Sequence, residues 1–167
     1  MKIGIFSDSH ENLENLQQAI DWLNENNIKI IIHCGDVSRV NMLEELNSRF
    51  KGTTHLVWGN ADEGFFDEID YTDFKKIVFY DQLGKLEIEG KKIAWTHLPK
   101  TARELAKSGK YDLVFYGDNH KPWEERVGLT RLINPGNLAN IRCAPSFAVY
   151  DFNGRLELKV LEMMKKI

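Results

Sequence analysis

The chain has 167 residues, of which 43% are hydrophobic and 28% are charged, and its net charge is −3. These values are typical of one soluble globular domain, here residues 1–167, without a broad basic face for nucleic acid. No apolar run approaches the roughly 20 residues of a membrane helix. Asp8 comes too early for a secretory signal, and two cysteines imply no disulfide framework. We therefore expect a cytoplasmic protein that does not bind membranes.

Apolar runs and periodic side chains in the N-terminal half predict alternating strands and helices. Buried strands are expected at residues 2–6, 28–34 and 54–58. Helical spacing predicts two helices between them, with Asn12 as the N-cap of the first and an end near Gly52 for the second. The apolar positions with this spacing are Leu13, Leu16, Ile20 and Leu23, then Val40, Leu43, Leu46 and Phe50. This order favours a parallel sheet with right-handed crossovers.

The second half of the chain contains shorter strands. A brief helix is expected at residues 101–108, capped by Thr101 and ended by Gly109. Tight turns are expected at residues 89–91 and at Asn153-Gly154. The predicted strands are residues 77–80, 85–89, 92–96, 112–116, 125–127, 132–133, 146–152 and 155–162. The whole pattern predicts an α/β domain with two packed sheets flanked by helices.

Five short polar clusters follow apolar β-forming runs, and they are the most informative feature of the chain. They are Asp8-Ser9-His10, Gly35-Asp36, Gly59-Asn60, Thr96-His97 and Gly117-Asp118-Asn119-His120. The carboxyl ends of strands in an open α/β sheet converge on one crevice, so these side chains can meet. Their oxygen and nitrogen atoms suit zinc, manganese, iron or nickel. The clusters therefore predict a metal site with two ions.

Each cluster has a simpler interpretation when it is taken alone. Asp8 could cap the following helix and leave His10 at the surface, Gly35-Asp36 is typical of a turn, and His97 could be hydrogen-bonded at a strand end. The combination favours the metal site, because five separate strand ends all supply metal-competent residues. In that interpretation Asp8 and His10 reach one ion, and Asp36 bridges two ions through its two oxygens.

In order and approximate spacing these clusters, together with Asn134-Pro135-Gly136, resemble the motifs of the calcineurin-like metallophosphoesterases, in the small bacterial and archaeal phosphodiesterase branch. The similarity runs from residue 2 to about residue 152. It implies a four-layer αββα sandwich, with two mixed β-sheets flanked by helices. It also implies a metal-dependent phosphodiesterase or phosphatase that hydrolyses a small phosphoester by attack of a metal-bridging hydroxide.

The resemblance implies two divalent ions and a role for each ligand. Manganese is expected, with nickel, zinc, iron or magnesium as alternatives. Asp36 resembles the bridging carboxylate, and Asn12 corresponds to a residue that relatives place near the phosphate. The other ligands are Asp8, His10 and His120 for the first metal, and Asn60 and His97 for the second.

The chain departs from the family pattern at three positions. Asp118 stands where the family has a second-metal histidine, and a carboxylate ligand favours manganese or magnesium over zinc and lowers the charge of the site. Pro99 replaces the second histidine of Thr-His-Gly-His, and Ala61 stands where some relatives carry a catalytic histidine. The general acid is therefore unassigned, with Asp62, Glu63 or a metal-bound water as candidates.

Two other functions compete with the enzyme. Changes at Asp118 and Pro99 would suit a protein-interaction scaffold on a decayed phosphoesterase fold, but a scaffold has no need to keep the six other metal ligands together. A nuclease ranks third, because the chain lacks a basic face. The short strands near the C-terminus could pair across a dimer, so a homo-oligomer is a further expectation to test.

Overall fold

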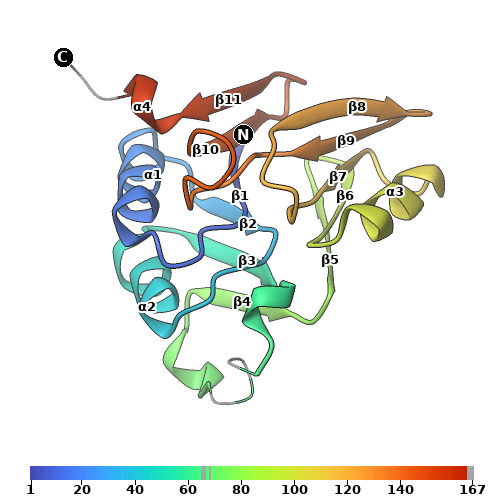
Figure 1. The fold of residues 1–167 in the computed structure, drawn as a ribbon. Coiled ribbons are helices and arrows are strands. Elements are labelled where there is room, and N and C mark those ends of the chain that lie inside the picture. The colour runs from blue at the N-terminus through green and yellow to red at the C-terminus, as the bar shows by residue number, and fades with distance from the viewer. Residues whose placement is uncertain (65–66, 68, 165–167) are drawn as a thin grey trace.

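The computed structural model describes residues 1–64, 67 and 69–164, and within them two β-sheets pack face to face between helices (Figure 1). The strands of the first sheet are β1 (Lys2–Phe6), β2 (Ile30–His33), β3 (Thr53–Val57), β4 (Ile77–Tyr80), β10 (Ser146–Asp151) and β11 (Leu156–Val160). They lie in the order β11-β10-β1-β2-β3-β4.

The strands of the second sheet are β5 (Leu83–Ile88), β6 (Lys91–Thr96), β7 (Leu113–Phe115), β8 (Trp123–Val127) and β9 (Thr130–Asn134). They lie in the order β5-β6-β7-β9-β8. Both sheets are mixed, since β1 runs parallel to β2 but antiparallel to β10, and β6 runs parallel to β7 but antiparallel to β5. The β5–β6 hairpin turns at Glu89 and Gly90, which both have positive φ, as a tight two-residue turn requires.

Helices cover the outer faces of both sheets (Figure 1). On the first sheet lie α1 (Leu13–Glu25), α2 (Val40–Arg49) and the short α4 (Leu161–Met164), and on the second lies α3 (Pro99–Lys107). Each helix buries one apolar face, as its sequence spacing predicts. Trp95 and Phe115 are fully buried between the two sheets. The predicted four-layer αββα sandwich is confirmed.

Several predicted boundaries are wrong, and the reasons are local. The helix expected at residues 101–108 begins at Pro99, because proline is well suited to a first helical position, and Thr101 lies inside its first turn instead of capping it. The strand expected at residues 155–162 ends at Val160, where α4 begins. The strand expected at residues 28–34 is limited to Ile30–His33.

Other expectations hold. Asn12 caps α1 by accepting a hydrogen bond from the Asn15 amide, and Gly109 follows α3 with a φ of 65°. A 3-10 turn at Asn60–Asp62 was not predicted, and it lies in the candidate site. Of the residues that the structure describes, none belongs to a helix with the length and apolar character needed to cross a membrane.

Candidate metal centre

The polar clusters meet where β1, β2, β3, β6 and β7 end. These strands are parallel within each sheet, and the two sheets face each other, so loops far apart in sequence reach one place. Among the described residues, two groups of three side chains have ligand atoms within 4.8 Å of one another. The groups are Asp8, His10 and His120, and Asp8, Asp36 and His97. Asp8 is common to both.

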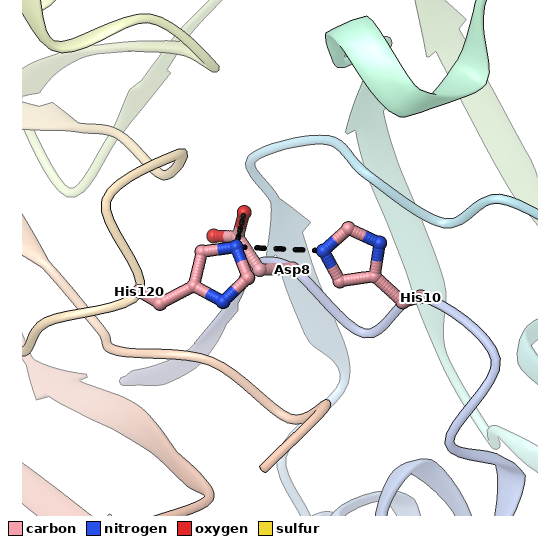
Figure 2. A group of neighbouring side chains, drawn as sticks. All are labelled: Asp8, His10 and His120. Carbon is pink, nitrogen blue, oxygen red and sulfur yellow. Dashed lines mark hydrogen bonds and ion pairs between the residues drawn. The ribbon is translucent and has the colours of Figure 1, made fainter. Parts of the chain in front are cut away.

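The first group faces inward around Asp8 (Figure 2). His120 Nε2 lies 3.3 Å from Asp8 Oδ1 and 3.5 Å from His10 Nε2. The other ring nitrogen of His10, Nδ1, lies 3.2 Å from Ser38 Oγ, which fixes the ring with Nε2 toward the group. Two imidazole nitrogens and a carboxylate oxygen converging in this way form a donor set for a cation.

The second group is centred on His97. Its Nδ1–H donates to the Cys34 carbonyl at 2.8 Å, so Nε2 is the nitrogen that faces the site. This Nε2 lies 2.9 Å from Asn60 Oδ1, 3.4 Å from Asp36 Oδ2 and 3.8 Å from Asp118 Oδ1. The structure thus gathers all seven sequence-predicted metal ligands in one place, with Asp118 on the His97 side.

Strained backbone conformations bring many of these side chains together. Five of the predicted ligands have φ in the left-handed region, where residues other than glycine are uncommon. They are Asp8 (51°), His10 (42°), Asp36 (59°), Asp118 (72°) and His120 (60°). Such conformations persist only where the surroundings enforce them, and they concentrate at functional sites. Here part of the enforcement is tertiary, since the amides of Asp8 and His10 donate to the carbonyls of Gly35 and Asp36.

Two glycines allow the loops to approach closely. A Cβ at Gly117 would lie 2.0 Å from Ser7 Oγ and 2.8 Å from Asp8 Oδ2. A Cβ at Gly59 would lie 2.1 Å from Asp36 Oδ1. Any side chain at either position would therefore push the ligand loops apart. This explains physically why glycine precedes Asn60 and Asp118 in the sequence.

The electrostatics of the site favour a bound positive charge. Burial raises the pKa of Asp8 to about 7. Burial alone would lower the pKa of His97, but its hydrogen bond to Asp36 and the charges of Asp36 and Asp8 raise that pKa to about 9. Burial alone would raise the pKa of Asp36, but the hydrogen bond and the charge of His97 lower it. The carboxylates thus stabilise a proton on His97. A divalent cation bound in place of that proton would neutralise more of their negative charge, so this donor set fits a metal.

Asp62 is a buried carboxylate whose role the sequence interpretation missed. It accepts hydrogen bonds from the backbone amides of Asp36, Val37, Ser38 and Gly59 at 2.7–3.0 Å. Fully enclosed and fully bonded, it cannot reach a substrate, so it is no longer a candidate for the general acid. Local spacing could indicate only the bond from Gly59, three residues away, because the other three partners lie 24 to 26 residues away in sequence.

Further polar side chains form hydrogen bonds with the loops that carry the predicted ligands. His33 is buried, which lowers its pKa to about 3, and it accepts from the Gly35 amide at Nδ1. Its Nε2–H is therefore free to donate to Ser9 Oγ, 3.1 Å away. Asn134 donates to the Gly117 carbonyl and Asn137 to the His120 carbonyl. These bonds orient the ligand-bearing segments.

The predicted phosphate residue, Asn12, lies beside the first group. Its Oδ1 caps α1 and its Nδ2 donates to the Ala139 carbonyl at 3.3 Å. It lines a pocket of about 600 Å³ together with His10, Ser38 and Ile141. Its contact with phosphate stays a prediction.

A second pocket, of about 160 Å³, lies against Asn60 and His97. The residues that line it include Trp58, Asn60, Glu63, His97 and Leu98. Glu63 is exposed beside Asn60, so it remains a candidate for the general acid. Each of the two pockets thus includes residues of the polar cluster in its lining.

Comparisons with known sequences agree with this geometry. A profile described as the calcineurin-like phosphoesterase superfamily domain matches residues 1–155. The chain is similar to Phosphodiesterase MJ0936 of Methanocaldococcus jannaschii, with 35% identity over 139 residues, which cover 81% of this chain and 83% of that protein.

Solved structures show the same similarity. A structure described as a novel archaeal phosphodiesterase superposes with a TM-score of 0.87 at 29% identity, covering 96% of this chain and 99% of that one. YfcE, a phosphoesterase from E. coli, superposes with a TM-score of 0.69 at 16% identity, covering 96% and 100% of the two chains, and this likeness concerns the fold alone.

Proposed function

We propose that this chain, which belongs to the calcineurin-like phosphoesterase superfamily and is a hydrolase, is a phosphodiesterase that works with two divalent ions. Manganese is the expected metal for both. The proposed substrate is a small phosphodiester. The proposed ligands of the first ion are Asp8, His10 and His120, and those of the second are Asn60, His97 and Asp118, with Asp36 between them.

The position of Asp36 is the observation that carries this proposal. Its Oδ2 lies 3.7 Å from His10 Nε2 and 3.4 Å from His97 Nε2, so one carboxylate oxygen faces the imidazoles of both groups. Its Oδ1 accepts a hydrogen bond from the Ala61 amide at 2.9 Å, which fixes the carboxylate plane. The sequence interpretation has Asp36 bridge through both oxygens, but its Oδ1 is engaged by Ala61, so the proposed bridge would use Oδ2 alone.

The chemistry follows from the residues that face the site. Bound divalent ions act as Lewis acids toward a phosphoryl oxygen and lower the pKa of water. His97 is held by Cys34, and His10 by Ser38, so neither ring needs to reorganise to use its Nε2. Asp118 adds a carboxylate to the His97 side, and oxygen ligands favour manganese or magnesium.

Metal add-back to stripped protein tests the proposal. Protein treated with a chelator would receive manganese, nickel, zinc, magnesium or iron singly, and hydrolysis of bis-p-nitrophenyl phosphate and bound metal per chain would be measured. We expect turnover with two manganese ions bound. Absence of turnover with every ion would contradict the proposal, and one bound ion without turnover would favour the scaffold interpretation.

Asp36→Asn sharpens this test. The substitution keeps the size of the side chain and removes the bridging charge, so we expect loss of the second ion and of turnover. Asp112→Asn is the matched control, because Asp112 also accepts a backbone hydrogen bond, from Lys92, but lies at the opposite end of β7. If Asp36→Asn hydrolyses the diester as fast as the parent, the bridging role is wrong.

A further inference from the structure

Asp62 uses its full hydrogen-bonding capacity on the backbone of the metal-ligand loops. Its Oδ1 accepts from the amides of Val37 and Ser38 at 2.8 and 2.7 Å. Its Oδ2 accepts from the amides of Asp36 and Gly59 at 3.0 and 2.8 Å. A carboxylate offers about four acceptor positions, so none is left for a ligand or a substrate.

These bonds lock the loop after β2 to the loop after β3. The lock is reciprocal, because Asp36 Oδ1 accepts from the Ala61 amide while Asp62 accepts from the Asp36 amide. Asp36 and Ser38 have φ of 59° and 68°, conformations that need external support in residues other than glycine. The described structure gives that support through Asp62, which has no exposed surface.

The lock extends to both ligand groups. Gly59, held by Asp62, directly precedes Asn60, whose Oδ1 lies 2.9 Å from His97 Nε2. Ser38, also held by Asp62, has its Oγ 3.2 Å from His10 Nδ1. We propose that Asp62 is the positioning residue of this centre, which sets Asp36 and Asn60 directly and His10 through Ser38. The inference rests on the proposed function only in taking these side chains as metal ligands.

Asp62→Asn is the variant that tests the inference. The amide keeps the size of the side chain but offers one acceptor oxygen, and its NH₂ would face backbone N–H donors. We expect the affinity for the second manganese ion, measured by isothermal titration calorimetry, to fall about 10- to 100-fold. This is the usual effect of removing a residue that orients metal ligands through hydrogen bonds. Asp112→Asn should leave both affinities unchanged. Parental affinities in Asp62→Asn would overturn the inference.

Two readouts separate positioning from a general-acid role. For a positioning residue, excess manganese restores turnover of Asp62→Asn toward the parental kcat, and the defect is the same for activated and unactivated leaving groups. A general acid predicts the opposite, namely a defect that manganese does not restore and that is confined to poor leaving groups. That pattern would overturn the inference.

A measurement without metal keeps this inference distinct from the proposed function. In chelator-treated protein, hydrogen exchange at the amides of Asp36, Val37, Ser38 and Gly59 should be faster in Asp62→Asn than in the parent, and Asp112→Asn should not change it. Unchanged exchange would overturn the positioning role whether or not the parent hydrolyses a diester. Failure of the parent to bind manganese would instead contradict the proposed function.

Discussion

Raising the pH of the metal-free protein from 7 to 9 is expected to destabilise it, because His97 loses its proton in this range. Burial would lower the folded-state pKa of His97, but its hydrogen bond to Asp36 and the charges of Asp36 and Asp8 raise it to about 9, against an ordinary value of 6.5. Between these two values the folded chain binds more protons than the unfolded chain. The free energy of unfolding therefore falls as the pH rises.

The size of the effect follows from the pKa difference. Each unit is worth about 1.4 kcal/mol, and integrating the titration of His97 from pH 7 to pH 9 gives a loss of about 2 kcal/mol. Below pH 7, the raised pKa of Asp8 and the lowered pKa of His33 change stability in opposite directions and mask the effect. Because the pKa of Asp8 is about 7, Asp8 adds a smaller loss of the same sign near pH 7.

Urea unfolding in the presence of a chelator, at pH 7, 8 and 9, measures this loss. His97→Gln should remove most of the pH dependence. His55→Gln is the matched control, because His55 is also a histidine, half-buried and hydrogen-bonded to Tyr80. Burial lowers the pKa of His55, so its imidazole is neutral from pH 7 to pH 9. A flat parental profile, or an unchanged slope in His97→Gln, would refute the reasoning. Manganese affinity should rise over the same range, because the ion competes with this proton.

Three further outcomes are expected. Gly117→Ala should lower the free energy of unfolding by about 1 to 3 kcal/mol, because its Cβ would lie 2.0 Å from Ser7 Oγ; Leu129→Ala, which trims a side chain that is 93% exposed, is the control, and equal losses in urea unfolding would contradict this. Asp118→His should shift the metal preference from manganese toward zinc in competition binding, and an unchanged preference would show that Asp118 is not a ligand. Phe147→Ala should cost about 3 to 5 kcal/mol in the same unfolding assay, because the ring is fully buried, and a loss below about 1 kcal/mol would count against that packing.

Much of the fold follows from local patterns in the sequence. The strands at residues 2–6 and 77–80 are confirmed at both ends, and the Asn12 cap is in place. Local propensity was insufficient at residues 161–164, where α4 packs Leu161 under α1 although the sequence continues a strand-like pattern. Tertiary packing decides the conformation there.

The polar residues that gather at the candidate metal centre could also be picked out from the sequence, because each polar cluster directly follows an apolar strand; their role as ligands stays a prediction. Their supporting residues were not. The sequence does not distinguish Ser38 from an ordinary loop residue, and it offers Asp62 only as a candidate acid. The structure places the Ser38 hydroxyl beside His10 and the Asp62 carboxylate on backbone amides.

By itself, the sequence determined the α/β class, most of the strands and helices, and which polar residues end each strand. These properties depend on neighbours within a few positions, which a pattern records. The tertiary structure alone decided that Asp36 faces both His10 and His97, that Asp62 accepts four backbone hydrogen bonds, and that the pKa of His97 is raised in the metal-free chain. Each of these depends on distances and burial between segments tens of residues apart, which exist only once the two sheets have packed together.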